Sequence, residues 1–264
     1  MQSLKHGFTD VDHQDHPEDW VRVLDVLSDE PFYAAYQARV RDLLHPVAGR
    51  RYVEVGAGTG ASAARLIEEH DVEVVTLDRS ETMIAAQRAR GLPHPLTADA
   101  HSIPLPDNSF DGASADRTIQ HVADPDRCIS EMVRVTRSGG WVVIADPDYS
   151  TQTLSIDDQS LAAAILAYRA AHIRNGQLAH LHAPMLARHG LRNITVETRT
   201  ATARDLDAFD HVWGLRTWAT PAAAAGFTDG DRTTEFQQQI DEAAASGAFT
   251  YTVTFFVTAA QAPD

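Results

Sequence analysis

The chain has 264 residues, and 44 % of them are hydrophobic, which is enough for a full globular core. Its 37 acidic and 22 basic residues give a formal net charge of −15, which argues against a nucleic-acid partner because phosphate binding needs clustered lysine and arginine. The single cysteine, Cys128, excludes an internal disulfide, and no apolar run is long enough to span a membrane. We therefore expect a cytoplasmic protein without membrane or nucleic-acid partners, and self-association into a homo-oligomer remains open.

Two helical stretches are expected near the amino terminus, and the second has the clearer signals. Pro31 suits a first helical turn, and the acidic residues before it favour the positive end of the helix dipole. Apolar residues then recur at helical spacing from Phe32 to Leu44. Packing is the simpler explanation of this face, although Tyr33 and Tyr36 are candidates for contacting a substrate.

From residue 51 onward, short apolar segments alternate with helical segments. The segments expected to be strands are residues 52–55, 72–77, 95–98, 110–115 and 141–145. Helices are expected between them, with Ser80 and Asp124 as N-caps and glycines as stop signals. Repeated strand–helix–strand units predict a parallel, doubly wound α/β sheet.

The chain changes character after residue 147. Residues 148–192 are expected to form helices with a break at Gly176, and residues 204–247 are expected to be mainly helical. Two further strands are expected at residues 193–202 and 249–258. The predicted organisation is one domain over residues 1–264, divided into an N-terminal helical cap (1–48), a cofactor-binding core (49–147), a helical lid insertion (148–192) and a C-terminal completion of the sheet (193–264).

A glycine-rich run, VEVGAGTG at residues 53–60, joins the first expected strand to a helix. Glycines allow a tight turn and the close approach of a nucleotide-like ligand. A dinucleotide fingerprint would be satisfied by Gly56, Gly58 and Ala61, and Asp78 lies about 20 residues further on, where either kind of cofactor has its ribose hydroxyls bound. The loop alone therefore leaves the cofactor open.

Glu54 lies inside the first strand, two residues before the first glycine. A buried carboxylate is costly unless a partner satisfies it. A cationic ligand or the backbone amides of the loop are two such partners, and the second would make Glu54 a purely structural residue.

Further segments decide between the cofactors. Asp99 and Ala100 follow the third strand, and they are followed by IPLPDNSFD (103–111), RTIQHVADP (117–125) and EMVRVTRSGG (131–140). Together with the glycine run and Asp78, this set resembles the class I S-adenosylmethionine-dependent methyltransferases, in particular the ubiquinone/menaquinone-biosynthesis-like group of small-molecule methyltransferases. The resemblance covers residues 50–147 closely and implies a Rossmann-like seven-stranded sheet, mostly parallel with an antiparallel last strand, plus a helical lid.

The resemblance implies a role for each matching residue. The loop residues would lie against the methionine portion of the cofactor; they are Glu54, Gly56, Ala57, Gly58 and Gly60. Asp78 would bind the ribose hydroxyls, and Arg117 would lie near the amino-acid end. The adenine would be held by Met83, Asp99, Ala100 and His101.

Arg79 departs from the pattern, since many relatives carry a smaller or apolar residue after the ribose-binding acid. An arginine here could bind a 2′-phosphate, which keeps an NADP-dependent oxidoreductase as an alternative. Asp78 argues against that alternative because it would repel the phosphate.

Candidate residues for chemistry lie beyond the strands. His121 is the candidate general base, because a histidine near neutral pKa suits proton removal from a phenol, enol or amine. A structural histidine that caps its turn is the alternative. No metal site is expected, because His180 and His182 would share a face only on a strand. Further candidates for contacting the substrate are Asp148, Tyr149, Arg174, His180 and His182.

The predicted function is transfer of a methyl group from S-adenosylmethionine to a small molecule, by in-line displacement, with S-adenosylhomocysteine as the product. We expect O- or C-methylation of a phenol, quinol or secondary metabolite. Three alternatives remain open from the sequence: a rearrangement, cyclisation or decarboxylation on the same fold with the same cofactor, an NAD(P)-dependent oxidoreductase, and a binding module without catalysis.

Overall fold

The structure, a computed structural model, describes residues 10–263, so residues 1–9 of the predicted N-terminal cap lie outside the described residues. The described chain divides into two compact units. We call residues 10–146, 179–197 and 256–263 the larger unit, and residues 147–178 and 198–255 the smaller unit. The segment predicted as a lid, 148–192, is therefore shared, because its residues 179–192 belong to the larger unit.

The larger unit contains most of the sheet and the helices that cover it. Its helices are α1 (Pro17–Asp29), α2 (Pro31–Asp42), α3 (Ala61–His70), α4 (Glu81–Ala89), α5 (Pro125–Val135) and α7 (His182–Arg188), with single 3-10 turns at Val11–His13 and Ala179–Leu181. Its complete strands are β1 (Arg51–Val55), β2 (Glu73–Asp78), β3 (His94–Thr97) and β4 (Phe110–Asp116). Three longer strands have residues in both units, namely β5 (Thr136–Leu154), β6 (Arg192–Ala203) and β7 (Tyr251–Gln261).

The strand order is β3-β2-β1-β4-β5-β7-β6. The first five strands pair in parallel, so that Val53 lies opposite Val75 on one side and Ala113 on the other. β7 runs antiparallel to both neighbours, since Ala262 N–H donates to Gly140 O of β5 and the Asn193 amide donates to Gln261. The predicted fold class, a mostly parallel seven-stranded sheet with an antiparallel last strand, is confirmed.

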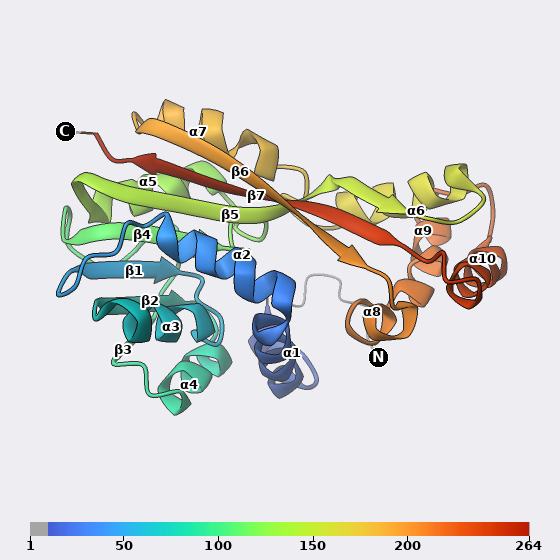
Figure 1. The fold of residues 1–264 in the computed structure, drawn as a ribbon, viewed down its shortest axis with the longest axis horizontal. Helices are drawn as coiled ribbons and strands as arrows, with labels where there is room; N and C mark the ends of the chain where they lie inside the picture. Colours follow the sequence, from blue (N-terminus) through green and yellow to red (C-terminus); the bar gives the residue numbers. More distant parts are fainter. Residues whose placement is uncertain (1–9, 264) are drawn as a thin grey trace. The chain divides into compact units, whose positions relative to one another are not determined.

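Helices cover both faces of the sheet in the larger unit. Figure 1 shows α2 in front of β1 and β4, and α5 behind β5. The layered arrangement follows from local signals: the Asp124 carboxylate accepts from Arg127 N–H at 2.9 Å and caps α5, as expected from the sequence. The side chains between the layers are fully buried; they include Val53, Ala113, Ile129 and Val143. Among residues 10–263, no helix is both long and apolar enough to cross a membrane.

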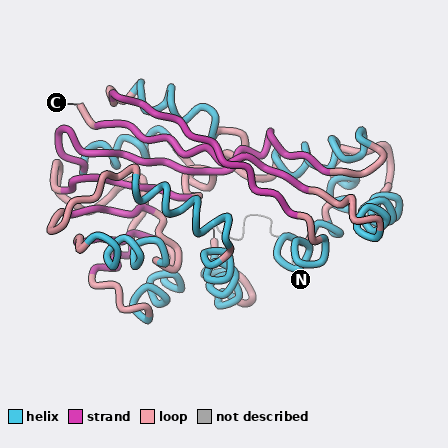
Figure 2. Tube along the Cα trace, in the orientation of Figure 1, coloured by secondary structure: helices cyan, strands magenta, loops and turns pink. Residues whose placement is uncertain are grey.

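The smaller unit consists of strand segments and four helices, drawn in magenta and cyan in Figure 2. The helices are α6 (Gln159–Ala171), α8 (Leu206–Trp213), α9 (Ala219–Ala224) and α10 (Thr233–Ala245), with a 3-10 turn at Leu215–Thr217. The expectation that strand five ends near residue 145 is wrong, because β5 continues to Leu154. Threonines of β7 pair with this extension: the Thr153 and Thr252 hydroxyls lie 2.6 Å apart, and Thr254 N–H donates to Thr151 Oγ1 at 2.9 Å. Pairing with a distant strand thus overrides the local helical pattern.

Candidate active site

The glycine loop follows β1 at the carboxyl end of the parallel strands, where open α/β sheets bind their ligands. Gly56, Gly58 and Gly60 have φ angles of +68°, +55° and +74°, a region that side chains with a Cβ adopt only under strain. Crowding adds to this requirement at two of them. A Cβ on Gly56 would lie 2.3 Å from Thr118 Oγ1, and one on Gly60 would lie 2.2 Å from a Leu92 methyl group.

The backbone amides of this loop are largely occupied by the protein itself. Ala57 N–H donates to Leu77 O, Gly58 N–H to Asp78 Oδ2, and Gly60 N–H to Ala57 O, each at 2.9 Å. A dinucleotide site uses such amides to hold a pyrophosphate. Since these three donors already have acceptors, the loop is poorly suited to a phosphate.

Glu54, on β1, is 6 % exposed, and no described residue donates a hydrogen bond to its carboxyl group. Burial, reinforced by the nearby Asp116, raises its pKa to about 8, although Arg41 and Arg117 act in the opposite direction. The side chain is therefore a buried acid that a positively charged ligand would satisfy.

Asp116, at the end of β4, contacts several polar side chains near Glu54. Its carboxylate accepts hydrogen bonds from the Tyr36 hydroxyl and from the Gln37 amide, the second at 3.0 Å. Burial raises the pKa of Tyr36 well above its usual value, with the Asp116 charge as the next cause. Arg117, with a φ of +51°, lies 3.6 Å from Asp116, and its guanidinium lies 5.0 Å from the centre of the Tyr33 ring. The structure thus brings three predicted residues, Tyr33, Tyr36 and Arg117, to one place.

Asp78 closes β2 beside the loop. Its carboxylate accepts from Gly58 N–H at 2.9 Å and from Ser80 N–H at 3.0 Å, while burial raises its pKa. Each oxygen keeps acceptor capacity for a ribose hydroxyl. Met83 is buried on α4, whereas Arg79 is exposed and makes no contact with a described carboxylate.

Asp99 and His101 form a local pair after β3. Asp99 accepts from His101 N–H at 2.9 Å, which is the main reason its pKa is lowered, and its oxygen lies 2.5 Å from His101 Nδ1. His101 Nε2 accepts from Asp124 N–H at 3.1 Å, so the proton of the neutral ring is on Nδ1. Asp99 is exposed and Ala100 is half-buried, which leaves this edge accessible to an adenine ring.

Asp12 is a residue that the sequence reasoning missed. Its carboxylate accepts from the Ser80 hydroxyl at 2.6 Å and from the N–H groups of Glu81 and Thr82 at 2.9 and 3.1 Å. Partial burial would raise its pKa, but the hydrogen bonds lower the pKa to about 2. The segment before α1 is thereby fixed to the amino end of α4, next to Asp78. No local signal could have revealed this partner, because 68 residues separate Asp12 from Ser80.

The histidine candidates differ in burial. His121 is half-buried in the loop after β4, and its N–H donates to Thr118 O at 2.9 Å. His180 is exposed, whereas His182 is fully buried with its Nε2 3.5 Å from Asp146 Oδ2. Burial also raises the pKa of Asp146 well above its ordinary value. His182 therefore packs inside the larger unit, and among residues 10–263 no three histidine, cysteine or acidic side chains gather as metal ligands would.

The remaining substrate candidates belong to the smaller unit. Asp148 is fully buried, and its carboxylate accepts from Ser150 N–H and Oγ at 2.9 and 2.5 Å. Tyr149 is half-buried, and its N–H donates to Gly176 O at 2.7 Å. Arg174 is exposed. The Asp148 carboxylate therefore bonds a residue of its own strand two positions further on, as aspartates in turns do.

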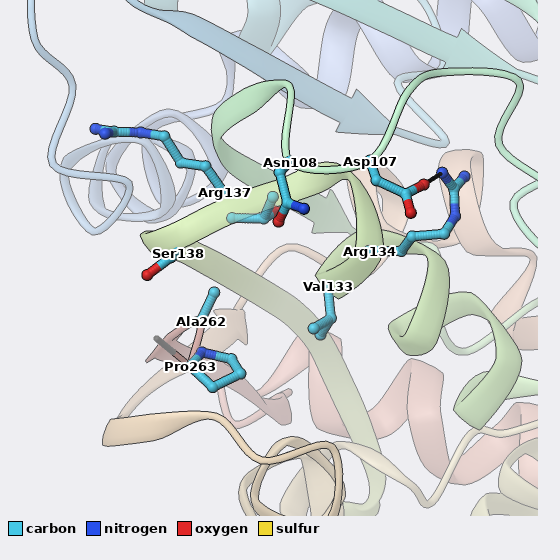
Figure 3. Close-up of a pocket in the computed structure, with 9 residues that line it drawn as sticks. Asp107, Asn108, Val133, Arg134, Arg137, Ser138, Ala262 and Pro263 are labelled. Carbon is cyan, nitrogen blue, oxygen red and sulfur yellow. Dashed lines mark hydrogen bonds and ion pairs between the residues drawn. The ribbon is translucent and has the colours of Figure 1, made fainter.

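A separate pocket of about 730 Å³ opens at the other edge of the larger unit (Figure 3). It is lined by Asp107, Asn108, Val133, Arg134, Thr136, Arg137, Ser138, Ala262 and Pro263. Thr136 begins β5 and pairs with Phe110 at the start of β4, so this pocket lies at the amino ends of the strands. Arg134 is held there by Asp107 at 2.6 Å, and the pocket is no part of the site beside the glycine loop.

The residues of the larger unit fit S-adenosylmethionine better than a dinucleotide. That cofactor carries an ammonium group and a sulfonium group, and when bound it supplies an activated methyl group. Glu54 offers a buried acid without a donor among the described residues, Asp78 offers free acceptor capacity, and three of the loop amides already have acceptors. The dinucleotide alternative does not fit this arrangement.

Comparisons with known proteins agree with this fit. A family model described as a methyltransferase domain matches residues 53–144. An uncharacterised 37.1 kDa protein in transposon TN4556 of Streptomyces fradiae is 32 % identical over 251 residues, covering 92 % of this chain and 72 % of that protein. An O-methyltransferase of Pyrenophora dematioidea is 29 % identical over 153 residues, covering 55 % of each chain, so this chain spans only about half of that relative.

A solved structure matches the fold over most of the chain. The crystal structure of a putative methyltransferase from Bacillus halodurans C-125 superposes with a TM-score of 0.63 and 17 % identity, covering 87 % of this chain and 100 % of that one. At this identity the match concerns the fold alone. Since the methyltransferase family model agrees with this fold, the chain belongs to the class I S-adenosylmethionine-dependent methyltransferases and uses S-adenosylmethionine as its cofactor.

Proposed function

We propose that this methyltransferase acts on a small molecule and methylates an oxygen or carbon atom of a phenol, a quinol or another secondary metabolite. The observation that carries the methyl-transfer part is the buried acid Glu54, which lacks a hydrogen-bond donor beside the glycine loop. The acceptor class is supported by the Pyrenophora relative, which is named as an O-methyltransferase. The net charge of −15 disfavours nucleic acid as the acceptor.

The protein's main task would be to align the acceptor with the bond between sulfur and the methyl carbon. Because the electrophile is already activated, orientation and exclusion of water supply most of the rate enhancement, and alignment of this kind is worth about 7–11 kcal/mol. The acceptor atom forms a bond to the methyl carbon as the carbon–sulfur bond breaks, so the products are the methylated acceptor and S-adenosylhomocysteine. The seven candidates for contacting the acceptor stay predictions; they are Tyr33, Tyr36, Asp148, Tyr149, Arg174, His180 and His182.

We assign removal of the acceptor's proton to His121. A phenol or enol must lose its proton during the reaction, and a positioned base is typically worth about 10²–10⁴-fold in rate. His121→Gln should lower kcat by at least about 100-fold and remove the acidic limb of the pH profile, while affinity for S-adenosylhomocysteine stays unchanged. A purely structural His121 would instead lower thermal stability and leave the shape of the pH profile intact.

A turnover assay tests the proposal directly. The full chain is incubated with S-adenosylmethionine and a panel of phenols, quinols and enols, and both S-adenosylhomocysteine and the methylated product are measured by mass spectrometry. We expect equal amounts of the two products with at least one acceptor class. Consumption of an acceptor without release of S-adenosylhomocysteine would favour the alternative of a rearrangement, cyclisation or decarboxylation on the same fold.

We also propose that the protein works in the cytoplasm, since its single cysteine, Cys128, is a buried free thiol. Burial raises the pKa of this thiol to about 12, so Cys128 is unreactive at neutral pH. Light scattering of the purified chain tests whether it forms the homo-oligomer that the sequence left open.

A further inference from the structure

Arg169, in the smaller unit, combines a buried guanidinium nitrogen with the lack of an acidic partner among the described residues. It lies in the last turn of α6, and no described residue forms an ion pair or hydrogen bond with its guanidinium group. Its Nε is fully buried without a hydrogen-bond partner. Such a donor normally costs free energy when it is removed from water and left unpaired.

Two other arginines of this unit, Arg216 and Arg232, do have acidic partners. Arg216 contacts three aspartates, Asp207, Asp210 and Asp241, at 3.0, 3.3 and 2.9 Å. Arg232 contacts Asp158 at 2.7 Å and also pairs with Glu235. Arg169 differs from the exposed arginines of this unit, such as Arg174 and Arg199, because its Nε is fully buried as well as unpaired among the described residues.

Aromatic rings hold Arg169 in place. Its guanidinium carbon lies 4.9 Å from the centre of the Trp218 ring and 5.8 Å from that of Tyr149. Trp218 is itself fixed, because its ring N–H donates to Trp213 O at 2.9 Å and its ring packs edge-on against Tyr251 at 6.1 Å. Contacts over ring faces stabilise the charge while they leave the N–H groups of the guanidinium edge unused.

More aromatic surface adjoins this arrangement. Phe209 lies 6.1 Å from Trp218 and 6.4 Å from Trp213 between ring centres. Both Phe209 and Trp213 are half-buried, so part of each ring remains accessible. A flat apolar body could pack on these rings while an attached anion bonds the guanidinium edge.

We propose that Arg169 is the carboxylate-binding residue of a site in the smaller unit that takes a flat aromatic acid. A guanidinium group and a carboxylate match in a planar, two-bond geometry, which would satisfy the buried Nε. One arginine balances one negative charge, which favours a singly charged carboxylate over a doubly charged phosphate ester. The proposal concerns the smaller unit alone, and it does not depend on methyl transfer.

Isothermal titration calorimetry of the full chain tests this site with two near-isosteric probes. We expect 2-naphthoate to bind at least about 10-fold more tightly than 2-naphthamide, because only the first carries a charge for Arg169. Equal affinity for the two compounds, or no binding of either, would overturn the proposal. This arm uses the unchanged protein, so it stands even if a variant fails to fold.

Three variants then assign the effect to Arg169. Arg169→Met should weaken 2-naphthoate binding by about 10- to 100-fold. The affinity of Arg169→Lys for 2-naphthoate should lie between those of Arg169→Met and the unchanged protein, because lysine keeps the charge but loses the two-bond geometry. Arg199→Met is the matched control, since Arg199 is an exposed arginine of the same unit. Retention of full affinity by Arg169→Met, with S-adenosylhomocysteine binding intact as evidence of folding, would contradict the assignment.

Discussion

In the larger unit a buried acid, Glu54, has no hydrogen-bond donor among the described residues, whereas in the smaller unit a guanidinium group, that of Arg169, has a buried Nε without an acceptor among them. Glu54 lies beside the glycine loop, where the N–H groups of Ala57, Gly58 and Gly60 already donate to other acceptors. The guanidinium stands between two aromatic rings. The contrast teaches that a net charge of −15 describes the surface field of the whole chain and not the sign of its ligands, which is set locally by what each buried group lacks.

The largest expected effect tests whether the glycine loop is the cofactor site. Gly56→Ala should lower the free energy of unfolding by about 3 kcal/mol and S-adenosylhomocysteine affinity by at least about 100-fold, because the new Cβ meets Thr118 Oγ1 at 2.3 Å and the φ is +68°. Calorimetric titration and urea unfolding measure both quantities.

Gly49→Ala is the matched control for that substitution. Gly49 has a φ of +74° but nothing within 4 Å of the added Cβ, so it isolates backbone strain from crowding. We expect a loss of about 1 kcal/mol in stability and no change in affinity. If Gly56→Ala bound S-adenosylhomocysteine as well as Gly49→Ala does, the loop would not be the cofactor site.

The second effect tests whether the unpaired acid selects a cation. Glu54→Gln should weaken S-adenosylmethionine binding by about 10- to 100-fold at pH 8, because a neutral amide cannot balance the ligand's positive charge. In the unchanged protein the affinity should rise between pH 6 and pH 8, as Glu54, with a pKa near about 8, loses its proton. Glu54→Gln should lack this rise. Glu68→Gln, at an exposed position on α3, should retain it.

The same group sets the pH dependence of the ligand-free protein. The folded pKa of Glu54, about 8, lies above its ordinary value of 4.5, so the folded state binds the proton more tightly than the unfolded state. Its contribution to stability is full below about pH 4.5 and is lost as the pH rises through about 8. Glu54→Gln should therefore flatten this decline in urea unfolding measured from pH 5 to 8, and an unchanged decline would contradict the burial of a protonated acid.

A third, smaller effect concerns the neighbours of the acid. Tyr36→Phe should lower the free energy of unfolding by about 2 kcal/mol, because the buried Asp116 carboxylate loses the hydrogen bond from the Tyr36 hydroxyl and keeps the one from Gln37. Tyr52→Phe is the comparison, since the Tyr52 hydroxyl bonds only neutral backbone groups of Val47 and His45. It should cost about 1 kcal/mol in the same assay, and equal losses would mean that the Asp116 charge adds nothing.

The smallest effect concerns the rim of the larger unit's site. Asp12→Ala should cost about 1 kcal/mol of stability, the usual value of a lost helix cap, because α4 loses the acceptor of the N–H groups of Glu81 and Thr82. The pKa of Asp12 is lowered to about 2, so its contribution is full above about pH 4 and is lost as the pH falls through about 2. Asp10→Ala, at an exposed neighbour, should change stability by less than about 0.5 kcal/mol.

The sequence predicted what depends on neighbours along the chain. The strands and caps between residues 51 and 135, the mostly parallel seven-stranded sheet and the cofactor followed from periodic patterns and from a specific set of motifs. The extension of β5 to Leu154 could not be predicted, because it depends on threonines about 100 residues away in β7. Nor could the pairing of Tyr36 with Asp116, which are 80 residues apart.

Residues that the sequence grouped together are separated by the fold for a similar reason. His180 lies in a 3-10 turn and His182, two residues later, begins α7, yet His180 is exposed and His182 is buried against Asp146. Arg169 gave no signal, because an arginine in an apolar helical stretch is recognisable as unpaired only when the surrounding acids have been placed.

Because Asp12 binds α4, we expect the segment before α1 to become ordered late in folding. A contact that spans 68 residues closes a large loop, and the ordering of such a loop is entropically delayed until β2 and α4 exist to receive it. The amide protons of Glu81 and Thr82 are shielded by Asp12 in the finished structure. Their exchange with deuterated solvent would therefore report each transient release of the amino-terminal segment, beside Asp78, which is predicted to bind the ribose.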